Sequence, residues 1–151
     1  MMCYLIISII LKTCLPQLWN TSGGEIIYFG DTVVEVKVSS PYKFEMTNYE
    51  EGAVAIFSFP NLACLIITSN PLVSFEYDDY SPSKTIVIKE AILYEGSHAD
   101  CHWSKVVYRH TRIYFVHDPS IRENELLSSI RLINKGETVF EYLFNQWLST
   151  E

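Results

Sequence analysis

The stretch that decides the fold is AVAIFSFPNLACLIIT, residues 53–68. It contains no charged residue, and only Pro60-Asn61, a pair typical of turns, interrupts it. Successive side chains of a strand point to opposite faces of a sheet, and here both faces are mainly apolar. We therefore predict two central strands, over residues 53–59 and 63–68, that need a covering layer on each side.

The composition indicates one compact domain. Hydrophobic residues make up 48% of the 151 residues and charged residues only 19%, which excludes a disordered chain or a coiled coil. Lys and Arg number 11 against 18 Asp and Glu, so the net charge is −7. A charge of this sign argues against diffuse binding to nucleic acid. We expect residues 23–151 to form a single domain, preceded by a distinct segment of residues 1–22.

The amino-terminal segment has two interpretations. Residues 3–11 form an uncharged apolar run of signal-peptide length, too short for a stable transmembrane span. Asn20-Thr21-Ser22 is a glycosylation sequon, which has meaning only for a secreted protein. However, no Lys or Arg precedes the run, and residues 3–15 could instead cover the central sheet as a helix or strand. An exported and a cytoplasmic location both stay open.

Cysteine usage depends on the same question. Cleavage near residue 20 would leave Cys64 and Cys101, an even pair that could form one disulfide. We therefore expect a Cys64–Cys101 disulfide if the protein is exported.

Alternating apolar residues and turn signals predict further strands. Residues 25–29 and 32–38 flank Gly30-Asp31 and are expected to form a half-exposed edge hairpin. The core face of the last predicted hairpin carries Val106, Tyr108, Ile113 and Phe115. The turn spacing predicts about six to eight antiparallel strands in all. The other predicted strands cover residues 42–46, 72–77, 85–94, 103–108 and 113–117.

The last third of the chain predicts two helices. Asp118-Pro119 has the pattern of a helix start, an N-cap acceptor followed by proline, and the helix would end near residue 130 or 132. After Gly136, apolar residues from Val139 to Leu148 recur at helical spacing. The predicted class is therefore α+β, an antiparallel sheet with two carboxyl-terminal helices packed on it.

All four histidines lie between residues 98 and 117. In an extended chain His98, Asp100 and His102 would project on one side, and two imidazoles with a carboxylate can hold zinc or iron. His110 or His117 could supply a further ligand. This group is the candidate metal site of a hydrolase or oxygenase.

A second candidate site is a local basic face. Lys105, Arg109, Arg112 and Tyr114 would share the outward side of the last hairpin, in an acid-free run from Cys101 to His117. Such a face could receive a small anionic ligand or an acidic protein.

Motifs for common enzyme classes are missing from the sequence, including a nucleophile elbow, a P-loop, a dinucleotide fingerprint and His-Glu-x-x-His. The leading hypothesis is therefore a non-enzymatic domain that needs no cofactor and presents residues 103–117 to a partner. The alternative is the metal-dependent enzyme, with zinc or iron at His98, Asp100 and His102.

Overall fold

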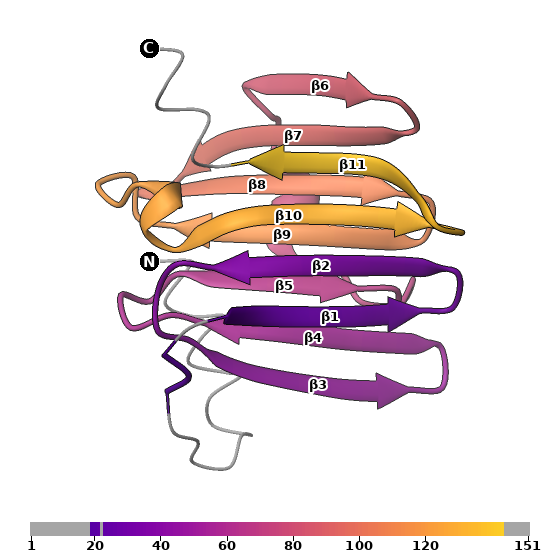
Figure 1. Ribbon diagram of the computed structural model, residues 1–151. Helices are drawn as coiled ribbons and strands as arrows, with labels where there is room; N and C mark the ends of the chain where they lie inside the picture. Colours follow the sequence, from indigo (N-terminus) through magenta and orange to yellow (C-terminus); the bar gives the residue numbers. More distant parts are fainter. Residues whose placement is uncertain (1–18, 22, 144–151) are drawn as a thin grey trace.

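The computed structural model describes residues 19–21 and 23–143, and these form a sandwich of two antiparallel sheets (Figure 1). The large sheet has the strand order β3-β4-β5-β9-β8-β7-β6, and the small sheet has the order β1-β2-β10-β11. The strands of the small sheet are β1 (Gly23–Phe29), β2 (Thr32–Val38), β10 (Leu127–Asn134) and β11 (Glu137–Leu143). Those of the large sheet are β3 (Lys43–Tyr49), β4 (Gly52–Ser58), β5 (Cys64–Thr68), β6 (Lys84–Ile88), β7 (Ala91–His98), β8 (Cys101–Tyr108) and β9 (Thr111–His117).

The two strands predicted over residues 53–68 are confirmed as β4 and β5. All five residues of β5 are buried, and β5 lies between β4 and β9. The small sheet covers its inner face, since Leu65 and Ile67 share one core cluster with Val36 and Leu132. The segment of residues 69–83, which we call the strap, covers part of the outer face.

The strap replaces the strand predicted over residues 72–77. It contains the short 3-10 helix η1 (Glu76–Asp79), and Tyr77 is buried against Trp103 of β8. Pro71 and the acidic residues of η1 offer little to a sheet ladder, since Pro has no N–H to donate. The strap therefore packs on the sheet instead of joining it.

The first hairpin is confirmed, with Gly30 at a φ of 63° in its turn. Val34, Val36 and Val38 are buried as the alternation predicts. Within this hairpin, however, β1 is the edge strand and β2 is not, because β2 also pairs with β10.

The prediction of two carboxyl-terminal helices is wrong. In the described residues helix is limited to η1 and to η2 (Glu123–Glu125), so the class is all-β and not α+β. The helix expected after Asp118-Pro119 stops at η2, and the chain continues as β10. Gly136, at a φ of 78°, belongs to the turn between β10 and β11 and does not separate two helices.

This error has a clear physical origin. The β-branched residues of 127–143 favour strands, and a β-bulge near Leu132 and Ile133 breaks the alternation that would have revealed them. Pairing with β2 buries Ile130 and Leu132 and decides the structure.

The strand count is also larger than predicted, with eleven strands in the described residues. The long strand expected over residues 85–94 is two strands, β6 and β7, because Lys89 takes a φ of 54° in a tight turn. Residues 3–15 and the apolar positions from residue 144 onward lie outside the described residues. Among the described residues, the structure contains no helix with the length and apolar character of a membrane span.

Candidate functional site

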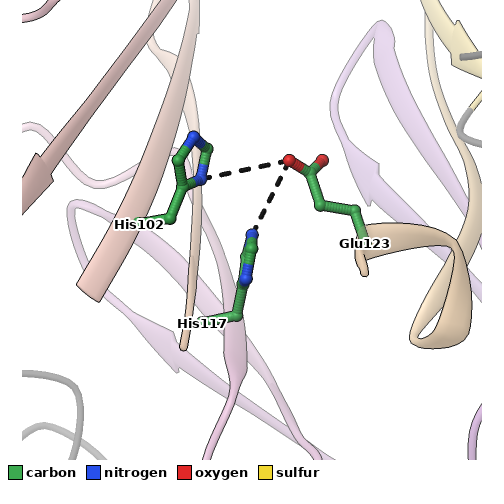
Figure 2. A group of neighbouring side chains, drawn as sticks. All are labelled: His102, His117 and Glu123. Atoms are coloured by element: carbon green, nitrogen blue, oxygen red, sulfur yellow. Dashed lines mark ion pairs between the residues drawn. The ribbon is translucent and has the colours of Figure 1, made fainter. Parts of the chain in front are cut away.

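Three side chains that could hold a metal ion meet at one end of the sandwich. His102 comes from β8, His117 from β9 and Glu123 from η2. Figure 2 shows the Glu123 carboxylate directed between the two imidazole rings. Glu123 Oε1 lies 3.9 Å from His102 Nδ1 and 3.6 Å from His117 Nε2, and all the ligand atoms fall within 4.8 Å of one another.

Strand register brings the two histidines together. The turn between β8 and β9 consists of Arg109 and His110 only, with Arg109 at a φ of 53°, and this makes His102 and His117 direct partners across the ladder. Both lie on the face that also carries Val106, Ile113 and Phe115, which is the inner face of the large sheet. The predicted shared core face of this hairpin is confirmed.

Glu123 reaches the histidines because the chain crosses from one sheet to the other at this point. The connection between β9 and β10 leaves the large sheet after His117 and enters the small sheet at Leu127. Leu126 and Leu127 are buried and fix the end of this connection. The short helix η2 therefore lies over the end of β8 and β9 with Glu123 facing inward.

The two imidazoles are held in a defined state. His117 Nδ1 donates a hydrogen bond to the carbonyl oxygen of Asp118 at 2.8 Å, which fixes the ring orientation and directs His117 Nε2 toward Glu123. The His117 side chain is only 5% exposed. Burial, together with the neighbouring His117, lowers the pKa of His102 despite the opposing effect of Glu123. Both effects favour the neutral form of His102, the form of imidazole that binds a metal.

The inward nitrogen atoms lack hydrogen-bond partners. His102 Nδ1 and His117 Nε2 are both buried without one among the described residues. Their distances to Glu123 exceed the roughly 2.7–3.2 Å of a hydrogen bond. The two distances, 3.9 and 3.6 Å, are slightly longer than the separation of two ligand atoms on a tetrahedral zinc ion, which is roughly 3.4 Å for bonds near 2.05 Å.

The structure does not bring together the three residues predicted as metal ligands, and of these only His102 belongs to the cluster. Ala99 and Asp100 both have positive φ, 48° and 66°, because they form the two-residue turn between β7 and β8. This turn places His98 opposite Cys101, on the outer face, where its ring stacks on Tyr80 at 4.0 Å. Asp100 is exposed at the turn.

The basic face predicted on the last hairpin is largely covered by the strap. Lys105 Nζ lies 2.6 Å from Asp78 Oδ1, and Tyr114 donates a hydrogen bond to the same oxygen at 2.6 Å. Arg112 donates to the carbonyl oxygen of Asn70 at 2.6 Å. Arg109 is exposed and lies 3.5 Å from Glu90. Three of the four predicted binding residues thus hold the strap on the sheet.

The predicted Cys64–Cys101 disulfide is wrong. Cys64 carries a free thiol buried on the outer side of β5, whereas Cys101 is disulfide-bonded. Burial raises the pKa of the Cys64 thiol to about 12, so this cysteine is not a reactive thiolate.

Sequence reasoning missed Glu123 and the pairing of the histidines. Glu123 is an ordinary polar residue of a segment predicted as helix, and no sequence signal marks it. The pairing could have been found, because a two-residue turn at Arg109-His110 places His102 opposite His117, whereas the strands predicted over residues 103–108 and 113–117 leave a four-residue turn and a different register.

Comparison with known proteins gives no further guide, since no protein family, curated protein or solved structure matches this chain. The function must therefore be inferred from the site itself.

Proposed function

We propose that this protein is a metal-binding β-sandwich domain in which His102, His117 and Glu123 hold a divalent transition-metal ion, with zinc as the best fit. The observation that carries the proposal is the convergence of two buried imidazole nitrogens, neither of them hydrogen-bonded within the described part of the chain, on one carboxylate oxygen. A buried polar atom without a partner costs about 1–3 kcal/mol, and one metal ion would satisfy both nitrogens at once.

A simple ion pair explains the cluster less well. An ion pair with His102 requires the protonated ring, which burial disfavours. An ion pair would also draw the Glu123 oxygen into hydrogen-bond distance of one ring, but the oxygen lies between both.

The ligand set indicates which metal fits. Imidazole nitrogens suit zinc, copper, iron and nickel, whereas magnesium and calcium prefer oxygen ligands. Two histidines and one glutamate form the protein ligand set of one class of zinc site and also resemble that of non-haem iron sites. The hydrogen bond from His117 Nδ1 to Asp118 supplies the second-shell contact that orients a ligating histidine.

The hypothesis that the hairpin of residues 103–117 recruits an anionic partner has weaker support. Lys105, Arg112 and Tyr114 already bind groups of the strap, and only Arg109 is widely exposed.

Isothermal titration of the chelator-treated protein with Zn²⁺ tests the proposal. We expect one bound ion per chain, and at least about a 100-fold weaker affinity in His117→Ala, since loss of even a second-shell partner costs 10–100-fold. Glu123→Gln should weaken binding less, because an amide oxygen remains as a weak ligand. His98→Ala and His110→Ala are matched controls outside the cluster and should leave the affinity unchanged.

The proposal would be overturned by the absence of Zn²⁺ binding. It would equally fail if His98→Ala weakened binding as much as His117→Ala does.

A further inference from the structure

We infer that the fourth coordination position of this metal site faces a small cavity between the two sheets and takes a water molecule bonded to Ser104. This inference rests on the proposed function, because it assigns the open position of the same site.

The cavity lies between β7, β8 and β9 of the large sheet and β10 and β11 of the small sheet. Its volume is about 20 Å³, which matches one water molecule, since a water needs at least roughly 10–15 Å³. Leu93, Phe115 and Phe140 are among its apolar walls. Glu95, Ser104, Glu123 and Tyr142 are its polar lining residues.

The cavity and the metal cluster share a boundary. Glu123 lines the cavity and belongs to the cluster. Ser104 is two residues from His102 on the same face of β8, a spacing of about 7 Å along the strand. The same relation holds between Phe115 and His117 on β9, whose rings are 5.0 Å apart. The cavity therefore adjoins the metal cluster through Glu123, and its wall begins at Ser104 and Phe115, the next pair along β8 and β9 on the same face as the two histidines.

Polar groups in the cavity suit a water. Ser104 Oγ is buried and has no hydrogen-bond partner among the described residues. Glu95 is the direct neighbour of Ser104 across the β7–β8 ladder. The Glu95 side chain is largely buried and lies 4.0 Å from Lys84 Nζ. A buried water needs two to four polar partners, and this lining offers them.

The surroundings also decide the ligand class. The cavity has no room for an organic molecule, and the Glu95 and Glu123 side chains disfavour an anion. A neutral water fits both its size and its charge. Zinc sites with three protein ligands and a water are of the open class that hydrolytic enzymes use, in contrast to closed structural sites with four protein ligands.

Crystal structures of the zinc-loaded protein test the inference. We expect a water 2.0–2.2 Å from the zinc ion, the distance typical of zinc–oxygen ligation, within hydrogen-bond reach of Ser104 Oγ. Ser104→Val replaces the hydroxyl with a methyl group and adds a second methyl group, so the water should disappear from the cavity. By titration this variant should bind Zn²⁺ about 10-fold more weakly or worse, as for a lost second-shell partner.

Two further variants complete the design. Ser104→Ala removes the hydroxyl without filling the cavity, so it keeps the test open if the valine variant does not fold, and it should also weaken zinc binding. Ser97→Val makes the same chemical change at the exposed neighbour of His102 on β7 and should leave the affinity within about twofold. A purely structural role of Ser104 would change the stability of the variants but not their zinc affinity.

The outcomes separate the two claims. Zinc on the three ligands with its fourth ligand on the solvent side, above a dry cavity, would overturn this inference and leave the proposed function intact. Failure of zinc to bind the three residues would overturn both.

Discussion

At the scale of single residues, Gly96 shows how packing on the outer face of the large sheet fixes a residue type. A Cβ at this position would lie 2.6 Å from Cζ2 of Trp103, its partner on β8. Trp103 is itself only 2% exposed and has no room to move away. The glycine is therefore required by the indole ring that lies over it, and not by backbone conformation.

Replacing Gly96 with alanine should destabilise the protein by about 1 kcal/mol or more. Overpacking costs about 1–3 kcal/mol, which outweighs the 0.5–1 kcal/mol gained when a glycine leaves a strand. Urea unfolding of the single and double variants measures the effect.

The double variant is the control for this explanation. In a Trp103→Phe background the smaller ring leaves space, so Gly96→Ala should cost less than in the wild type. An equal cost in both backgrounds would show that contact with Trp103 is not the reason for the glycine.

At the scale of elements, Asp78 joins the strap to β8 and β9. Its carboxylate lies 2.6 Å from Lys105 Nζ and accepts hydrogen bonds from Tyr114 and from the backbone N–H of Phe75. Burial alone would raise the pKa of Asp78, but these hydrogen bonds and the Lys105 charge outweigh it and hold the pKa below its usual value.

Asp78→Asn should lower the free energy of unfolding by about 1–3 kcal/mol at neutral pH, since it removes the charge of a partly buried hydrogen-bonded group. Because the pKa is lower in the folded state, this stabilisation is present above the unfolded pKa of about 3.9. It is lost as the pH falls through the lower folded pKa. Denaturant unfolding at neutral pH and below pH 4 should therefore show the gap between the two proteins narrowing in acid.

Asp79→Asn supplies the comparison within the same short helix. Asp79 is exposed, and a surface substitution of this kind should change stability by less than about 0.5 kcal/mol. A pH-independent gap for Asp78→Asn would contradict the electrostatic explanation.

Individual strands and turns also show which parts of the fold could be predicted from the sequence. The β1–β2 hairpin followed from alternation and a turn at Gly30-Asp31, and the central pair followed from an uncharged apolar run interrupted by Pro60-Asn61. The tight turns at Lys89-Glu90, Ala99-Asp100 and Arg109-His110 were not recognised, because none contains the glycine that usually marks such turns. The turn at Ala99-Asp100 places His98 and His102 on opposite faces of the large sheet, so His98 lies apart from the cluster that contains His102.

At the scale of the whole molecule, the core depends on the contact between the two sheets. Leu132 of β10 is fully buried in the cluster that also holds Leu65 and Phe115 of the large sheet. The sequence of residues 127–143 allows a helix or a strand locally, and pairing of β10 with β2 decides between them. Long-range pairing of this kind leaves little trace in a single sequence.

Leu132→Ala should therefore lower the free energy of unfolding by about 2–5 kcal/mol, as for other buried leucines. Ile26→Ala removes a similar side chain from the exposed face of β1, where Ile26 is 56% exposed, and should cost less than about 0.5 kcal/mol. Chemical denaturation of both variants checks the pair. Equal costs would mean that β10 does not face the large sheet.

The central claim is that His102, His117 and Glu123 form one metal site. Zinc K-edge X-ray absorption of the zinc-loaded protein in solution tests it most directly, because the spectrum reports the type and distance of the ligands. The account predicts nitrogen and oxygen ligands at about 2.0–2.2 Å, with the multiple scattering of two imidazole rings. In His117→Ala the zinc spectrum of this site should be lost. A sulfur shell near 2.3 Å, or a spectrum unchanged by His117→Ala, would contradict it.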